Sequence, residues 1–216
     1  MVTSIFSYPS AVSLAEFAEN PLIKVIAEHG LWVACILATL QHSIYASVFF
    51  VPSAARFLSK NHSTFVWGCY ALKISTVVVM LSGAVANHGL PCTYTNLCGL
   101  GWFLVVYGCS LNIHVHAILG TTGIYYGYEL GLITKEQFKV FTEYPYNLFN
   151  HPQYLGASLQ IIGGVAMWGF NSNATSRIDV LAAGLYMVAL YLITIQIEKL
   201  PSSIRPEHLQ AMKKTK

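Results

Sequence analysis

Residues 178–197 read IDVLAAGLYMVALYLITIQI, a run of twenty residues with one charged side chain, Asp179. An α-helix needs about 20 mainly apolar residues to cross the hydrocarbon core of a bilayer, so this run predicts a membrane-spanning helix. The whole chain agrees, because 55% of its 216 residues are hydrophobic, only 10% are charged and the mean hydropathy is +0.53. A soluble domain carries roughly a quarter charged residues. The composition therefore indicates an integral membrane protein.

Other apolar runs divide the chain into spans. The run 154–170 is joined to 178–197 by the short turn NSNATSR, so these two runs predict a C-terminal helical hairpin. The remaining spans are expected at about 31–51, 65–86 and 99–119. The fold class is thus all-α, a bundle of about five transmembrane helices. One membrane domain occupies residues 1–216, with an N-terminal interfacial segment (1–28), a transmembrane core (29–200) and a cytosolic tail (201–216).

The interfacial segment and the basic loops set the expected topology. Residues 11–28 mix apolar and charged positions and predict a short interfacial helix broken at Pro21. With five spans, nine lysines and arginines fall on one side of the membrane and two, Lys24 and Arg177, on the other. Basic loops stay cytoplasmic, so the C-terminus is expected in the cytosol.

The final residues, Lys213-Lys214-Thr215-Lys216, resemble a dilysine signal for retrieval to the endoplasmic reticulum. A basic tail that only fixes topology is the alternative, and both interpretations put the tail in the cytosol. The five cysteines fit no metal-ligand spacing, so no metal is expected. Cys92 and Cys98 share a loop on the predicted lumenal side, where a disulfide can persist, and both a bridge and free thiols remain open.

Two segments stand out chemically. Residues 119–128, LGTTGIYYGY, hold three glycines that allow a cofactor to approach the backbone closely, or helices to pack tightly. Residues 144–156, YPYNLFNHPQYLG, lead into the fourth span. Pro152 suits the first turn of a helix and leaves His151 near the cap. A helix N-terminus at this point can take an anionic group such as a carboxylate.

GTTGIYYG (120–127), TEYPYNLFNHPQYLGAS (142–158) and IQIEK (195–199), in that order and spacing, resemble the phospholipid methyltransferase family. The resemblance covers roughly residues 108–201. The family includes phosphatidylethanolamine and phosphatidyl-N-methylethanolamine N-methyltransferases. The HPQYLG core is also similar to a motif of isoprenylcysteine carboxyl methyltransferase.

The resemblance implies an enzyme that transfers methyl groups from S-adenosylmethionine to headgroup amines. The acceptors would be phosphatidyl-N-methylethanolamine and its dimethyl form, giving phosphatidylcholine, with phosphatidylethanolamine a further candidate. It implies a catalytic role for His151 and Glu198. It also implies a cofactor site formed by Gly120, Gly123, Tyr126, Gly127, His151, Pro152, Tyr154, Gly156 and Glu198. Glu198 would hold the amino-acid end of the cofactor. Many relatives carry two adjacent acidic residues here, whereas this chain has only Glu198.

Methyl transfer is an in-line displacement in which an enzyme mainly positions its two partners. The acceptor amine must lose a proton, and a histidine with a pKa near 6.5 can take it. The candidate bases are His151, His114 and His116, the last two being also plausible as ordinary interfacial residues. His42 and Lys73 lie within spans, where such groups are costly and often functional, but neither is assigned to catalysis.

Tyrosines crowd the predicted cytoplasmic interface, where aromatic belts are common. One or two of them could face the methylammonium group, because aromatic faces attract quaternary ammonium. They are Tyr125, Tyr126, Tyr128, Tyr144, Tyr146 and Tyr154.

Three alternatives remain. A prenylcysteine carboxyl methyltransferase would methylate a carboxylate and need no base. A haem-binding bundle would use His42, His88, His114 and His116 as axial ligands, but it leaves both motifs unexplained. A non-catalytic membrane scaffold would use the motifs only for packing.

Overall fold

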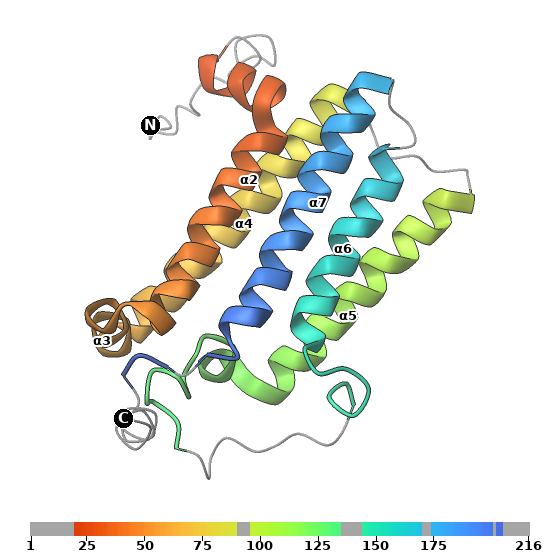
Figure 1. The fold of residues 1–216 in the computed structure, drawn as a ribbon. Coiled ribbons are helices and arrows are strands. Elements are labelled where there is room, and N and C mark those ends of the chain that lie inside the picture. Colours follow the sequence, from red (N-terminus) through yellow and green to blue (C-terminus); the bar gives the residue numbers. More distant parts are fainter. Residues whose placement is uncertain (1–19, 90–95, 135–143, 170–173, 201, 205–216) are drawn as a thin grey trace, which may run out of the picture.

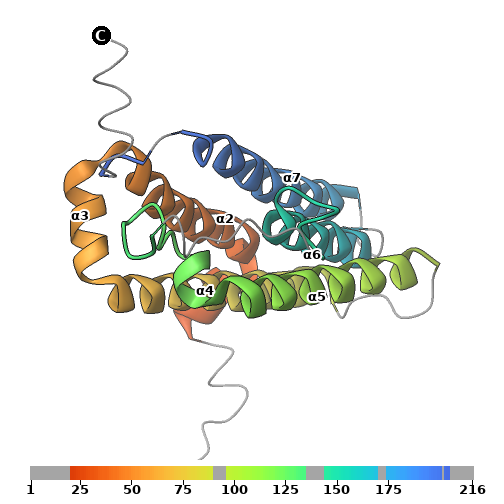
Figure 2. The same cartoon turned by 90° about the horizontal axis from the view of Figure 1, so that it is seen from below.

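The computed structural model describes residues 20–89, 96–134, 144–169, 174–200 and 202–204. Within these residues all regular secondary structure is helical, as the sequence predicts. The helices are α2 (Pro21–Phe50), α3 (Pro52–Lys60), α4 (His62–His88), α5 (Asn96–Ile124), α6 (Pro152–Gly169) and α7 (Ala174–Ile197). The long helices run side by side in one bundle, and α3 crosses one end of it between α2 and α4 (Figures 1 and 2).

The bundle is apolar on its outer surface. Four stretches are long and apolar enough to cross a membrane: Glu28–Phe50, His62–Asn87, Cys98–Ile124 and Arg177–Ile197. α6 is shorter and contains Gln153 and Gln160, and it lies between α5 and α7 (Figure 1). Large side chains such as Ile36 and Leu185 are 67% and 71% exposed. A helix that is hydrophobic on all sides is typical of a membrane span, so the all-α membrane fold is confirmed.

Two prolines begin helices where the sequence analysis placed breaks. α2 starts at Pro21 and continues without interruption to Phe50, so residues 21–28 are its first turns and not part of a separate interfacial helix. Residues 1–19 lie outside the described part of the chain. Pro52 begins α3, which was predicted as a loop. Proline is favoured in the first turn of a helix because its missing N–H would be unpaired there anyway.

Glycines set the distance between α5 and α6. A Cβ on Gly101 would lie 2.9 Å from the carbonyl oxygen of Gly163, and one on Gly156 would lie 2.7 Å from that of Gly108. The two glycines on each helix are seven residues apart, so both pairs fall on one face. Small residues at such contacts let membrane helices approach closely. A glycine contact also lets α2 approach α4 closely, since a Cβ on Gly30 would lie 2.7 Å from Gly83 Cα.

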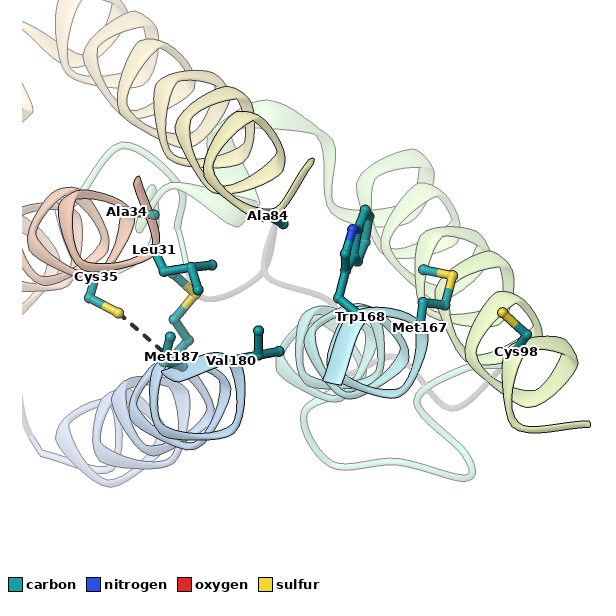
Figure 3. Packing of buried hydrophobic residues seen from close by; sticks show 10 residues of the cluster. Leu31, Ala34, Cys35, Ala84, Cys98, Met167, Trp168, Val180 and Met187 are labelled. Carbon is teal, nitrogen blue, oxygen red and sulfur yellow. Dashed lines mark hydrogen bonds between the residues drawn. The ribbon is translucent and has the colours of Figure 1, made fainter. Parts of the chain in front are cut away.

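A buried apolar cluster closes the end of the bundle that lies away from α3 (Figure 3). It joins Leu31 of α2, Trp168 of α6 and Met187 of α7. The Trp168 indole N–H donates to the carbonyl of Gly89 at 3.1 Å. Cys98 at this end is disulfide-bonded, whereas Cys35, Cys69 and Cys109 are free. Cys92, the predicted partner of Cys98, lies outside the described residues.

Both motifs lie at the opposite end of the bundle, the end that α3 crosses (Figure 1). Side chains tie this end together. Ser59 Oγ donates to the carbonyl of Leu130 at 2.9 Å, and Ser202 Oγ to that of Glu129 at 2.7 Å. The segment that follows α7 is thereby fixed against the loop that follows α5. The expectation that the two motifs share one face of the molecule therefore agrees with the structure.

Candidate functional site

The glycine motif folds into a compact loop at the end of α5. Gly120 has φ +62°, a left-handed conformation that glycine adopts readily, and it kinks the helix. The loop closes through Gly127 N–H, which donates to the Thr122 carbonyl at 2.8 Å. Tyr126 also has a positive φ, 58°. A tyrosine in this conformation costs about 1–3 kcal/mol, and such strain gathers at ligand clamps and active sites.

The loop buries two adjacent tyrosines against different helices. The Tyr126 ring packs edge-on against Tyr45 and Phe49 of α2, with centroids 5.4 and 5.6 Å away. The Tyr125 ring packs against α4, 5.3 Å from Tyr70. The Tyr126 hydroxyl is thereby fixed toward α6 and α7.

The second motif brings Tyr154 to the same place. Pro152 opens α6 and is fully buried, so the first turn of this helix is fixed. Tyr154, half a turn further on, lies with its hydroxyl 3.4 Å from that of Tyr126. The Tyr154 hydroxyl donates a hydrogen bond to Glu198 Oε1 at the end of α7. Three predicted site residues from three distant segments therefore form one connected group.

Burial decides the electrostatics of Glu198. Burial is the largest effect and raises the pKa of this carboxyl to about 7. The charge of Glu129 also raises this pKa, whereas hydrogen bonds from Tyr154 and Tyr126 lower it. Lys199 does not neutralise it, because its ammonium donates to Gln196 Oε1 at 2.9 Å. Glu198 is thus a partly buried carboxylate with no cation paired to it among the described residues, an arrangement that favours a cationic ligand.

His151 and Tyr146 stand next to this group. The His151 ring centroid lies 6.2 Å from that of Tyr154. Burial, followed by the charge of Lys199, lowers the pKa of His151, so its imidazole is neutral near pH 7. Burial and the nearby Glu198 raise the pKa of Tyr146 to about 12. The site thus combines a carboxylate, a neutral imidazole and several phenol rings.

Other predicted site residues have structural surroundings of their own. Gly156 faces α5, where a Cβ would meet Gly108 and Asn112. A Cβ on Gly127 would lie 2.5 Å from the Thr122 carbonyl oxygen within its own loop. A Cβ on Gly120 would meet no neighbouring atom within 4 Å, and a Cβ on Gly123 would meet only Leu119. Packing accounts for Gly156 and Gly127, so of the predicted glycines Gly120 and Gly123 are the ones free to contact a cofactor.

The two alternative bases lie away from Glu198. His114 and His116 are on the exposed surface of α5, and His114 Nδ1 lies 3.0 Å from the Ser110 carbonyl of the preceding turn. The His114 ring contacts Tyr144, with centroids 5.5 Å apart. Of the three candidate bases the structure brings only His151 to the Tyr126–Tyr154–Glu198 group.

The sequence analysis missed the inward extension of the site. Tyr191, two turns before Glu198 on α7, lies 5.9 Å from the Tyr154 ring. It also lies 4.8 Å from His42, whose Nδ1 is 2.6 Å from Thr194 Oγ1. The spacing along α7 could have revealed this extension. Tyr191 and Thr194 are three residues apart, and Glu198 follows four residues after Thr194. That spacing places them on one face of a helix.

Comparison with known proteins agrees with the predicted family resemblance. Residues 97–200 match the profile of the phospholipid methyltransferase family, a range that contains Tyr126, Tyr154 and Glu198. The predicted family resemblance is confirmed. A curated relative, phosphatidyl-N-methylethanolamine N-methyltransferase of Arabidopsis thaliana, is 33% identical over 61 residues. That alignment covers 28% of this chain and 35% of the relative. No solved structure matches the chain.

The phospholipid methyltransferase match leaves part of the bundle unaccounted for. α2, α3 and α4 all precede residue 97. Two of these helices nevertheless contact the motif loop, because Tyr45 and Phe49 of α2 pack on Tyr126 and Tyr70 of α4 packs on Tyr125. The match supports methylation of a phospholipid as the general class of reaction.

Proposed function

We propose that this chain is an S-adenosylmethionine-dependent phospholipid N-methyltransferase. Its acceptors are phosphatidyl-N-methylethanolamine and phosphatidyl-N,N-dimethylethanolamine, and its final product is phosphatidylcholine. The observation that carries the proposal is the Tyr126–Tyr154–Glu198 group, in which a partly buried carboxylate is paired with no cation among the described residues. The family match over the same segments supports it.

The residues at the site fit the donor. S-adenosylmethionine supplies a methyl group on a sulfonium and carries an α-ammonium on its amino-acid end. In our proposal Glu198 binds that ammonium, and Tyr154 orients the carboxylate by its hydrogen bond. Gly120, which faces open space, and Gly123 leave the nearby backbone accessible to the cofactor. Charge-assisted contacts of this kind are about twice as strong as neutral hydrogen bonds.

The acceptor amine must be neutral when it attacks the methyl group. His151 is proposed to take its proton, since the lowered pKa keeps this imidazole unprotonated near pH 7. The phenol rings of Tyr126, Tyr146 and Tyr154 offer faces that attract the increasingly methylated ammonium group. Catalysis then rests on proximity, a proton acceptor and a desolvated site.

Substitution of Glu198 tests the proposal. Glu198→Gln should raise the dissociation constant for S-adenosylmethionine at least tenfold, because a hydrogen bond to a charged group contributes about 1.5–3 kcal/mol. Glu198→Asp should recover part of the loss. Glu28→Gln is the matched control, since Glu28 lies on the first turns of α2 and its side chain is 71% exposed. Unchanged affinity in Glu198→Gln would remove Glu198 from the cofactor site.

The acceptor is tested separately. Purified protein should transfer labelled methyl groups to the monomethyl and dimethyl lipids, and phosphatidylethanolamine should be assayed beside them. Methylation of a prenylcysteine peptide without methylation of any phospholipid would replace this function by a protein carboxyl methyltransferase. We further propose that the enzyme resides in the endoplasmic reticulum membrane with its site facing the cytosol, on the basis of the basic loops and the Lys213-Lys214 tail.

A further inference from the structure

A second group of polar side chains lies deeper in the bundle than Glu198. This inner cluster, as we call it, comprises His42 and Tyr45 of α2, Cys69 and Lys73 of α4, and Tyr191 and Thr194 of α7. It is continuous with the proposed methyl-transfer site, since the Tyr45 ring lies 5.4 Å from Tyr126 and the Tyr191 ring 5.9 Å from Tyr154.

Most members of the inner cluster satisfy one another. His42 Nδ1 lies 2.6 Å from Thr194 Oγ1, and its ring packs edge-on against Tyr191. The Tyr45 hydroxyl accepts a hydrogen bond from Gln41, and the Tyr45 side chain is buried in one cluster with Cys69. Lys73 differs. The groups within its electrostatic range are Cys69 and His42, and neither carries a negative charge at neutral pH.

A lysine at this depth is costly. Lys73 lies eleven residues into α4, which places its Cα roughly 16 Å from the start of the helix at a rise of 1.5 Å per residue. No carboxylate pairs with it in the part of the chain that the structure describes. Ionisable residues inside membrane spans are expensive, and they usually mark a binding site or a transport path.

The direction of the side chain connects Lys73 to the site. In an α-helix the Cα–Cβ bond tilts toward the N-terminus, and the N-terminus of α4 lies at the site end of the bundle (Figure 1). Cys69 lies one turn closer to that end on the same face of α4, and it is buried in one cluster with Tyr45 and Tyr126. Tyr45 in turn packs on Tyr126. The ammonium group thus extends from the membrane interior toward the Tyr126 side of the site.

We propose that Lys73 binds the phosphodiester of the acceptor phospholipid. This inference rests on the proposed function. In the acceptor an ethylene unit separates the phosphate from the nitrogen, so the anion must lie a short distance from the methyl-transfer centre and not at it. Lys73 fits that place, because it lies one turn from Cys69, which is buried with Tyr126, and Tyr126 is connected to Glu198 through Tyr154. The carboxylate of S-adenosylmethionine fits less well, since it is directly attached to the carbon that bears the ammonium held by Glu198.

Such a contact would use a non-reacting part of the substrate to position its reacting nitrogen. It also assigns a role to α4, which precedes the segment matched by the family. The N-terminal helices would then supply the phosphate contact while the C-terminal half supplies the cofactor site.

The test compares Lys73→Met and Lys73→Arg with Lys60→Met, a matched control at an exposed lysine of α3. Lys73→Met should raise the apparent KM for phosphatidyl-N-methylethanolamine about tenfold or more and leave the dissociation constant for S-adenosylmethionine unchanged. Lys73→Arg should keep most of the lipid affinity, and Lys60→Met should match the wild type. An unchanged lipid KM in Lys73→Met, or a loss of cofactor affinity in its place, would overturn the assignment.

A binding experiment separates this inference from the proposed function. Purified wild-type protein in detergent should be thermally stabilised by phosphatidyl-N-methylethanolamine and not by diacylglycerol, which lacks the phosphate. Lys73→Met should lose that difference, and Lys73→Arg should retain it. If no phospholipid is methylated but the lipid-specific stabilisation depends on Lys73, the enzymatic proposal fails and the phosphate site stands. If stabilisation is the same in Lys73→Met and wild type, the phosphate site fails.

Discussion

Glu198 shows how the surroundings of one residue set its chemistry. Its neighbours are phenols from two other segments, not a lysine or an arginine, and burial raises the pKa of its carboxyl to about 7. Near neutral pH the residue therefore exists in both protonation states. A bound ammonium group would favour the ionised form, because an opposite charge nearby stabilises it. Cofactor binding and ionisation of Glu198 should be linked.

The linkage predicts the pH dependence of cofactor affinity. Below the pKa of about 7 Glu198 is mostly protonated and cannot attract the ammonium without first losing its proton. The affinity for S-adenosylmethionine should therefore fall as the pH is lowered from 8 to 6, by up to about tenfold per unit below pH 7. Equilibrium dialysis with labelled cofactor measures this. In Glu198→Gln the remaining weak binding should lose the pH dependence, and an equally steep profile in that variant would assign the titration to another group.

At the scale of the helices, the contact between α5 and α6 holds the site in place. Gly101 faces Gly163 and Gly108 faces Gly156, so the two backbones touch along one line. α6 carries Tyr154 and α5 leads into the loop that carries Tyr126. The distance between these two hydroxyls therefore depends on how closely the helices pack.

Adjacent glycines of α6 allow a controlled test of this contact. A Cβ on Gly163 would lie 2.8 Å from Val105 Cγ2 and would meet the Gly101 carbonyl, whereas Gly164 has open space where its Cβ would be. Gly163→Val should destabilise the protein by about 1–3 kcal/mol through overpacking, and its melting temperature should fall by several degrees. Gly164→Val should leave the melting temperature near that of the wild type. Equal effects of the two substitutions would mean that α5 and α6 do not pack through these glycines.

At the scale of the whole molecule, α3, both motifs and the residues after α7 share one end of the bundle (Figure 1). The last turn of α6 and the first turn of α7 lie at the other end (Figure 1). The arrangement gives the bundle one end that carries the candidate site and one end closed by the apolar cluster of Figure 3.

The lysines and arginines of the loops and tail predict that the end of the bundle with the candidate site faces the cytosol. In a Cys109→Ser background, a cysteine replacing Ser53 of α3 should react with a membrane-impermeant thiol reagent in sealed microsomes. A cysteine replacing Asp179 of α7 should react only after the membrane is permeabilised. Both positions are exposed in the structure. The reverse pattern of labelling would invert the topology and place the proposed cofactor site in the lumen, away from the cytosolic cofactor pool.

The sequence by itself determined the helices and their order. Five apolar runs predict five helices in the bundle. Three of these runs precede the motifs and two follow them, so the motifs and the C-terminal tail are expected at the same end of the bundle. Hydropathy is a local property, so it is readable without the fold. The starts of α2 and α3 were less well predicted. Pro21 and Pro52 were read as helix breaks, whereas each is the first residue of a helix.

Only the tertiary structure decided which side chains meet. A membrane helix that is apolar on all sides has no polar stripe to reveal its inward face, so the sequence could not show that Gly156 faces α5 while Tyr154 faces Glu198. It could not show that Lys73 and His42, on different helices, lie in one cluster. Those contacts depend on how each helix is rotated against its neighbours. That rotation is set by glycine contacts and buried hydrogen bonds that form only when the bundle is assembled.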